Sequence, residues 1–221
     1  AREVSSRFPP PGQPSNFWGM QHLWGPENPA DPHNPMMDSL GRVWMTSKIR
    51  NDEAAWCQQG SDNKYAQYYP LSFSNRQASV FDPATQEFEL IDTCFATHHL
   101  QFASDPDRTL YFNELLGPIF GWVNTRLWDL THDEQLSQGW CPQIIDTNGD
   151  AVITKPWNPA DTENPDPELD TEVRKNLYTV IPDPNNADIV WGVSEDYPGY
   201  LVRLNRGDNP PESCISEVYE V

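Results

Sequence analysis

The sequence predicts an all-β fold built from repeated four-stranded units. Three segments, 38–46, 104–114 and 182–195, each place Asp, Pro, Asn or Gly turn residues before a short aromatic run of the kind found in strands. Helical periodicity is nearly absent, apart from a possible turn near 168–175. The chain is only 37% hydrophobic and has 22 prolines, but its 12% aromatic content indicates a folded, loop-rich protein instead of a disordered one.

The elements follow one another in a regular order. Residues 1–35, which carry PPPGQP and GPENPADPHNP, are predicted to form an extended proline-rich arm without regular structure. After each turn and aromatic strand comes a second short strand that ends at a turn, at 78–86, 122–130 and 200–208. Further runs at 87–92 and 216–221 supply an outer strand, and an inner strand completes each four-stranded unit.

Repeated four-stranded units are typical of the blades of a β-propeller. We expect three blades, at 36–97, 98–177 and 178–221, interrupted by insertions at 50–77 and 131–176. The second insertion is proline-rich and acidic, so we expect it to be hard to order without a metal ion. Propellers typically have about four to eight blades. Three blades would leave exposed edges, which predicts a fragment or subunit of a larger ring completed by blades of the same parent protein or of another chain.

Composition excludes some partners. With 33 acidic and 14 basic residues the net charge is −19, which would repel nucleic acid and anionic membrane surfaces. There is no apolar run near the length of about 18 residues that a membrane span needs. The start at Ala1, without a methionine or an apolar signal segment, is what we expect of a mature or trimmed product.

Four cysteines are widely spaced and form no CxxC pair, which argues against zinc or iron–sulfur sites. Their even number permits two disulfides, with three possible connectivities, although free buried cysteines are the alternative. We favour Cys57 with Cys94, because both flank the same predicted group of strands. With the acidity and the proline-rich loops, this favours a periplasmic or secreted protein.

The segment DTNGDAVIT suggests a calcium loop. Oxygen atoms at alternate positions can converge on one side of a tight loop, and such hard ligands suit Ca²⁺. The expected ligands are Asp146, Asn148, Asp150, the carbonyl group of Val152, and Thr154. Ala151 stands where Gly is preferred and Trp157 where a bidentate Glu is usual, so a further ligand would come from the insertion, at Asp161, Glu163, Asp166 or Asp170. The alternative is a simple hairpin turn; if Ca²⁺ binds, we expect a structural role.

Several motifs resemble those of known propellers. His99-Leu100-Gln101-Phe102 leads into TLYFNE, and VFDPATQEFELI closes the preceding unit. This pattern resembles the blades of virginiamycin B lyase-like and NHL-type propellers, over about residues 33–130 and 178–221. In such lyases, histidines facing the channel act with a glutamate and a divalent metal to remove a proton next to a carbonyl group.

The resemblance implies candidate catalytic residues. It places His99 at the histidine position of the channel and Glu114 at the glutamate position, with Mg²⁺ as the metal; His33 opens the first repeat and would join the same ring. Tyr178 stands at the corresponding place of the third repeat. An imidazole can take a proton near neutral pH while a carboxylate orients it or holds a metal ion. The alternative is that His98 and His99 are packing residues at a junction between blades.

Tryptophans are the other candidates for binding, because exposed aromatic planes hold sugars and apolar ligands. Trp44 and Trp191 fall on predicted strands and are expected in the core. Four tryptophans fall on predicted loops and could bind a carbohydrate or small molecule, although packing against the fold is the alternative: Trp18, Trp24, Trp140 and Trp157.

Two functions therefore remain. The first is an extracytoplasmic propeller module, stabilised by Ca²⁺, that binds a ligand or protein within a larger assembly. The second is a metal-assisted lyase or hydrolase that uses His99, His33 and Glu114. No GxSxG, P-loop, GxGxxG or HExxH motif suggests another enzyme class.

Overall fold

Turn residues precede the second strand in each of three four-stranded sheets. The computed structural model describes residues 31–48, 53–74, 76–114, 117–195 and 197–221, together with the backbone of 13–15 and 19–24. Asp38, Asp105 and Asp183 each accept a backbone N–H bond in the turn that follows the first strand, as Asx turns require. The strands after these turns coincide with the predicted aromatic runs.

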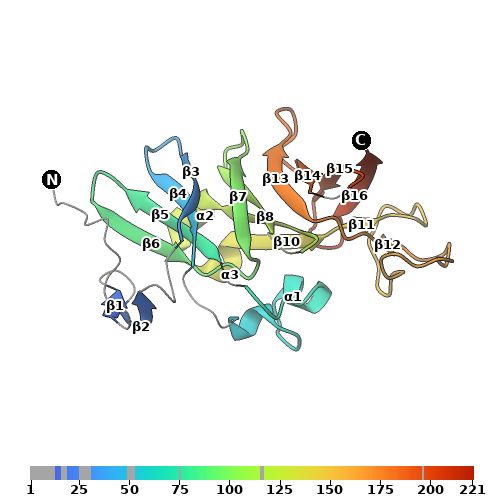
Figure 1. The fold of residues 1–221 in the computed structure, drawn as a ribbon, viewed down its shortest axis with the longest axis horizontal. Coiled ribbons are helices and arrows are strands. Elements are labelled where there is room, and N and C mark those ends of the chain that lie inside the picture. Colours follow the sequence, from blue (N-terminus) through green and yellow to red (C-terminus); the bar gives the residue numbers. More distant parts are fainter. Residues whose placement is uncertain are drawn as a thin grey trace.

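The prediction of a mainly β fold is confirmed. Each four-stranded sheet is an antiparallel meander in which strands adjacent in the sequence pair (Figure 1). The first consists of β3 (His33–Met37), β4 (Val43–Ser47), β5 (Gln77–Asp82) and β6 (Glu87–Ile91). The second consists of β7 (Thr97–Phe102), β8 (Thr109–Glu114), β9 (Ile119–Asn124) and β10 (Gln138–Pro142). The third consists of β13 (Leu177–Pro182), β14 (Ile189–Ser194), β15 (Tyr200–Asn205) and β16 (Ile215–Glu220).

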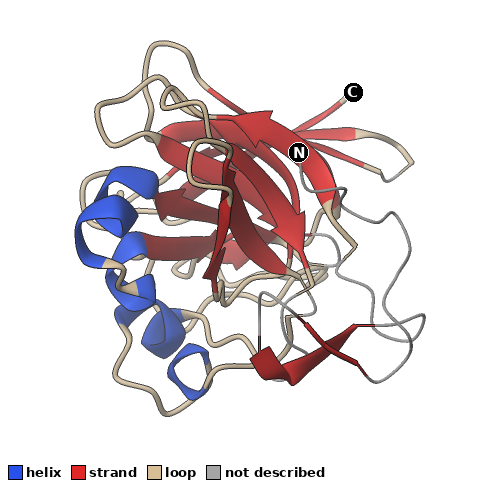
Figure 2. Cartoon of the chain, turned by 90° about the vertical axis from the view of Figure 1, so that its left-hand side faces the viewer, coloured by secondary structure: helices blue, strands red, loops and turns tan. Residues whose placement is uncertain are grey.

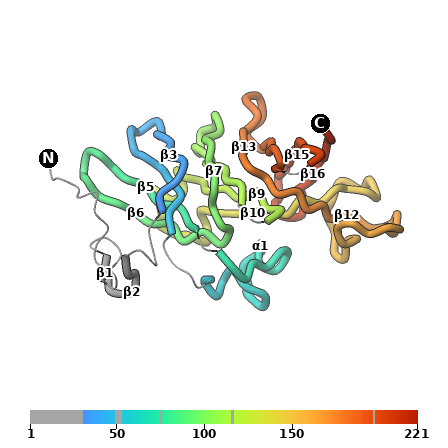
Figure 3. Tube along the Cα trace, viewed as in Figure 1, coloured from blue at the N-terminus to red at the C-terminus, as the bar shows by residue number. Residues whose placement is uncertain are grey.

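The first strands of the three sheets lie at their junctions. Strand β7 contacts β3 on one side and β13 on the other, so β3, β7 and β13 follow one another across the molecule (Figures 1 and 3). Tyr111 of β8 donates a hydrogen bond of 2.6 Å to the carbonyl oxygen of Ala187 in the third sheet. Gly192 of β14 has no side chain, and a Cβ there would lie 3.2 Å from the ring of Phe120. The second and third sheets can therefore approach closely at this point.

The predicted strand at 122–130 is wrong in its second half. Strand β9 ends at Asn124, and α2 (Thr125–Thr131) follows at once. The Asn124 side chain accepts a 2.8 Å bond from Leu127 N, as an N-cap should. Trp128 is buried on this helix and donates to Glu89 of the first sheet. The cap and this contact explain why the segment is helical despite its β-rich composition.

Other short helices were also missed. They are η1 (Ala55–Cys57), α1 (Lys64–Tyr68) and α3 (Glu134–Ser137). Asn63 caps α1 and Asp133 caps α3 through bonds to the backbone N–H groups of the first turn. Helices of four or five residues bury too little for an apolar stripe to show in the sequence. Figure 2 shows the helices gathered along one side of the sheets.

Two segments expected to be irregular contain paired strands. Within the predicted arm, β1 (Gln13–Ser15) pairs with β2 (Gly19–Trp24), and β3 already begins at His33. Within the second insertion lie α3, β10 and the pair of β11 (Ile144–Ile145) and β12 (Thr171–Glu172). Asn158, only 4% exposed, bonds with its side chain to the backbone of Asp166 and Leu169. Protein hydrogen bonds thus connect distant parts of the insertion.

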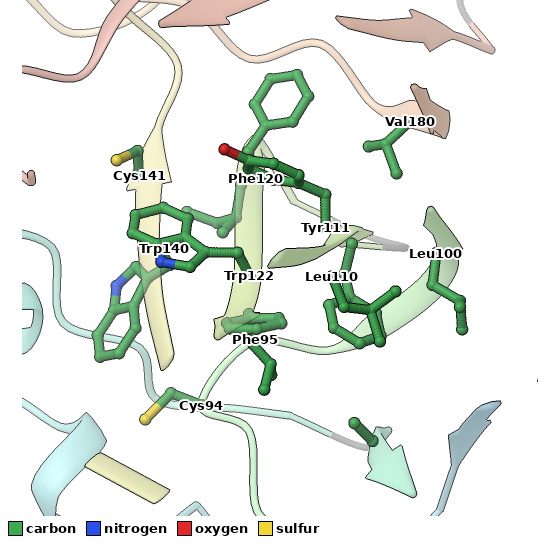
Figure 4. Close-up of a cluster of buried hydrophobic side chains, with 14 of the residues drawn as sticks. Cys94, Phe95, Leu100, Leu110, Tyr111, Phe120, Trp122, Trp140, Cys141 and Val180 are labelled. Carbon is green, nitrogen blue, oxygen red and sulfur yellow. The ribbon is translucent and has the colours of Figure 1, made fainter. Parts of the chain in front are cut away.

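The core is aromatic and is linked by two disulfides. Its largest fully buried side chains include Trp44, Trp140, Tyr111, Phe112 and Phe120, and Figure 4 shows part of this cluster. Burying each such ring stabilises the fold by about 2–3 kcal/mol before entropy costs. Disulfides join Cys57 to Cys94, as predicted, and Cys141 to Cys214. Among the described residues, no helix is long and apolar enough to cross a membrane.

Candidate functional site

Irregular pairing marks the start of the first strand in every four-stranded sheet. The register shifts between His33 and Met36 in β3, between Thr97 and Leu100 in β7, and between Leu177 and Thr179 in β13. Such bulges change the direction of side chains and are common next to functional sites. All three bulges lie where the sheets meet, so several side chains whose directions the bulges change lie close together there.

The bulge in β7 explains how two consecutive histidines face the same place. In a regular strand His98 and His99 would point to opposite faces of the sheet. Here their ring centroids are 4.1 Å apart. His33 from β3 stacks on His98 with centroids 4.8 Å apart and an angle of 4° between the rings, and its Nε2 lies 3.2 Å from Nε2 of His99. The structure thus brings together His33 and His99, both predicted, with His98.

Two asparagines hold the bulged backbone. Asn34, whose φ of 46° lies in the left-handed region, accepts a 3.0 Å bond from Leu100 N. Asn113 of β8 is fully buried and accepts a 2.8 Å bond from His99 N while its amide donates to the carbonyl oxygen of Leu177 at 2.6 Å. Because the same side chain bridges β7 and β13, Asn113 ties the histidine pair to the third sheet.

The third sheet sets the tautomer of His99. Its Nδ1 forms a hydrogen bond with the backbone carbonyl oxygen of Tyr178, which can only accept. Nδ1 therefore carries the proton, and in the neutral ring Nε2 keeps its lone pair facing His33. A backbone carbonyl that orients a histidine in this way is a usual partner of metal-binding imidazoles. The Tyr178 ring itself lies edge-on to both His98 and His99.

Burial favours the neutral forms of His98 and His33. It lowers the pKa of His98 to about 4, helped by the neighbouring rings of His99 and His33. Burial and His99 also lower the pKa of His33. The Asn113 amide nitrogen lies 3.4 Å from Nδ1 of His98. Neutral imidazoles are the form that binds metal ions, and a proton competes weakly with a metal here.

The three imidazoles are close enough together that they could hold a metal ion. One ring nitrogen from each of His33, His98 and His99 can be chosen so that all lie within 4.8 Å of one another. Two nitrogens bound to a tetrahedral zinc ion at about 2.0–2.1 Å are about 3.3 Å apart, close to the 3.2 Å between His33 and His99. One other group of this kind occurs among the described residues, Glu53 with Cys57 and Cys94, but its sulfur atoms form a disulfide.

Comparison of the chain with known protein families, curated proteins and solved structures found no match. The site is therefore interpreted from its own geometry.

Glu114, the predicted partner of the histidines, is not part of this group. It follows Asn113 on β8, and successive residues of a strand face opposite sides. Its carboxylate accepts a 3.3 Å bond from Ala96 N and lines a separate cavity. Burial raises the pKa of Glu114 to about 7. Asn113, which the sequence analysis passed over within YFNE, occupies the place by the histidines instead.

The predicted aromatic binding residues have different surroundings. Trp140 is not on a loop: it lies on β10, is fully buried and donates to the carbonyl oxygen of Tyr69, so the core holds it away from any external ligand. Trp157 is partly exposed and packs near Tyr68 and Tyr69. Trp18 and the side chain of Trp24 lie outside the described residues. Of the two expected core residues, Trp44 is fully buried and Trp191 only partly.

The predicted calcium loop is a series of Asx turns on the surface. Asp146 accepts backbone bonds from Gly149 and Ala151, and Asp150 accepts one from Val152. Asn148 accepts from Asp150 N in the same way. Among the described residues, no group of three or more acidic, histidine or cysteine ligands with atoms within 4.8 Å of one another includes Asp146 or Asp150.

Thr154, at the end of this loop, contacts the buried carboxylate of Asp170. Thr154 N donates a 2.9 Å bond to one carboxylate oxygen of Asp170. Asp170 is 1% exposed, and its other oxygen has no hydrogen-bond partner among the described residues. Ala151 has φ 65°, the left-handed conformation that calcium loops use at their sixth position, where Gly is preferred.

Proposed function

We propose that this chain holds a divalent transition-metal ion with His33, His98 and His99, as the working centre of an extracytoplasmic β-propeller-type protein. The observation that carries the proposal is the convergence of three imidazoles at the junction of the sheets. Nitrogen ligands suit Zn²⁺ or a similar ion better than Mg²⁺, which prefers oxygen. Two disulfides are compatible with the extracytoplasmic setting.

Three protein ligands leave a coordination position open. This is the arrangement of catalytic zinc sites, in which a bound water or substrate completes the shell. His33 and His99 are partly exposed and Tyr178 is 49% exposed beside them, so a substrate can approach. The site therefore favours metal-assisted hydrolase or lyase chemistry over the ligand-binding module, whose candidate Trp140 is buried. Further blades from the same parent protein or another chain would complete the ring and supply the rest of the substrate pocket.

Zinc binding tests this proposal. We expect the protein to bind one Zn²⁺ per chain by isothermal titration calorimetry, and we expect His99→Ala and His33→Ala each to weaken binding at least about 100-fold, because two ligands cannot hold the ion as three do. His132→Ala is the matched control, since His132 is the C-cap residue of α2 and its Nδ1 lies 3.0 Å from the carbonyl oxygen of Trp128. Equal zinc affinity in His99→Ala and the native protein would contradict the proposal.

A structural Ca²⁺ ion at 146–154 is a second proposal. It is supported by the left-handed Ala151 and by the unpartnered, buried oxygen of Asp170 beside Thr154. A carboxylate oxygen buried without a donor is costly, and a cation would remove that cost. The ligands would be Asp146, Asn148, Asp150, the Val152 carbonyl group and Thr154, with Asp170 at the end of the loop.

Calcium should then raise thermal stability. Ca²⁺ at about 100 times its Kd would stabilise the folded protein by about 2.7 kcal/mol, which differential scanning calorimetry would show as a higher Tm that a chelator reverses. Asp146→Ala should abolish this increase, whereas Asp208→Ala, an exposed acid on another loop, should leave it intact. A Tm that does not respond to millimolar Ca²⁺ would mean that the segment is only a series of turns.

A further inference from the structure

A cavity lies beside β8, apart from the histidines. Its volume is about 280 Å³, near the lower end of ligand-binding pockets. One wall is the segment after α1, from Tyr69 to Phe73, and the opposite wall comes from the second sheet. Phe73 is 56% exposed whereas Leu71 and Ile119 are buried, so the cavity extends inward from the surface at Phe73.

Glu114 is the one acidic residue among those that line this cavity. It is 8% exposed, and the hydrogen bond to one of its oxygens comes from Ala96 N. Its other oxygen, Oε2, lies so close to Gly117 that a Cβ there would be 2.0 Å away. Within the described chain, no lysine or arginine forms an ion pair with this carboxylate. When Glu114 is ionised, its charge is therefore uncompensated.

Most of the other residues that line the cavity are apolar or aromatic. Leu71, Pro118 and Ile119 supply apolar surface, and Tyr69 and Phe73 supply aromatic rings of the kind that attract cations. A buried carboxylate without a countercharge favours a ligand that brings one. The net charge of −19 also raises the local concentration of cations.

We propose that this cavity binds a small organic ammonium ion, with the ammonium group at Glu114 and a short apolar body between Phe73 and Ile119. The site is separate from the histidine cluster and needs no metal ion. Ligand binding ionises Glu114, whose proton passes to the solvent, and the ammonium group replaces it as the partner of the carboxylate. Binding should therefore release a proton near neutral pH, where the carboxyl group is partly protonated.

Benzylammonium is a suitable probe, with benzyl alcohol as its neutral counterpart. We expect calorimetry in the presence of EDTA to show benzylammonium binding one to one, with heats at pH 6.5 that depend on the ionisation enthalpy of the buffer. Glu114→Gln should weaken benzylammonium binding at least about tenfold and leave benzyl alcohol unaffected. Phe73→Ala should also weaken binding of benzylammonium.

His99→Ala and Glu163→Gln are the controls. His99→Ala should bind benzylammonium normally, because this cavity does not include the histidines, and its result separates the two sites. Glu163→Gln makes the same change of charge on an exposed loop and should have no effect. Failure of benzylammonium to bind at millimolar concentration, unchanged binding in Glu114→Gln, or equal affinity for the alcohol would each overturn the proposal.

Discussion

Replacing Asn113 with leucine is expected to lower the free energy of unfolding by about 3 kcal/mol. The fully buried amide satisfies two backbone groups, His99 N and the Leu177 carbonyl oxygen, and leucine can bond to neither. Each buried group that loses its partner costs about 1–3 kcal/mol. Urea unfolding of the metal-free protein would measure the change.

The same substitution should also weaken zinc binding. Asn113 fixes the backbone of His99 and lies against His98, and loss of such supporting groups typically costs about 10–100-fold in metal affinity. Asn185→Ala is the control, because Asn185 is exposed in the turn before β14. A change in stability below about 0.5 kcal/mol with unaltered zinc affinity would show that Asn113 does not hold the site together.

Glu114→Gln is expected to stabilise the protein at alkaline pH. Burial raises the pKa of Glu114 from 4.5 to about 7. The folded state thus holds this proton more tightly than the unfolded state does, so the contribution is fully present below pH 4.5 and is lost as the pH rises through 7. Each pKa unit corresponds to about 1.4 kcal/mol, so a shift from 4.5 to about 7 makes the variant about 3 kcal/mol more stable than the native protein at pH 8.5.

The contribution of His98 to stability changes with pH in the opposite direction, and it does so at lower pH. Its pKa is lowered from 6.5 to about 4, so its contribution is present above pH 6.5 and is lost as the pH falls through 4. As the pH falls from 6.5 to 4.5, the contribution of Glu114 raises the free energy of unfolding of the native protein and the contribution of His98 lowers it. In Glu114→Gln, only the loss of stability due to His98 should remain. Urea unfolding at several pH values would measure this, and a variant no more stable than the native protein at pH 8.5 would contradict the account.

Local turn chemistry made most of the strands predictable. The carboxylates of Asp38, Asp105 and Asp183, before β4, β8 and β14, accept backbone N–H bonds within each turn, which depends only on neighbours in the sequence. Helix α2 was missed because its evidence is tertiary: Trp128 reaches Glu89 of the first sheet. Trp140 falls within the predicted insertion at 131–176 and was expected on a loop, although pairing with β9 makes that segment a buried strand.

Part of the histidine site could also be predicted. The resemblance placed His33, His99 and Tyr178 at equivalent positions of three repeats, and the structure brings these residues together. The resemblance did not indicate that His98 joins these residues. Alternation along a strand predicts that His98 and His99 point to opposite faces of the sheet, and the bulge in β7 brings them to the same side. Glu114 and Asn113 are neighbours, and the same bulge decides which of them lies by the histidines. Asn34 and Asn113 gave no signal in one sequence beyond being polar residues next to predicted strands.

The central claim is that His33, His98 and His99 bind a metal ion together. X-ray absorption spectroscopy of the protein loaded with one equivalent of Zn²⁺ tests it most directly, because the first coordination shell reports the kind and number of ligands. We predict three imidazole nitrogens and one oxygen at about 2.0–2.1 Å. A shell of oxygen atoms alone, or a spectrum unchanged in His33→Ala and His99→Ala, would contradict the account.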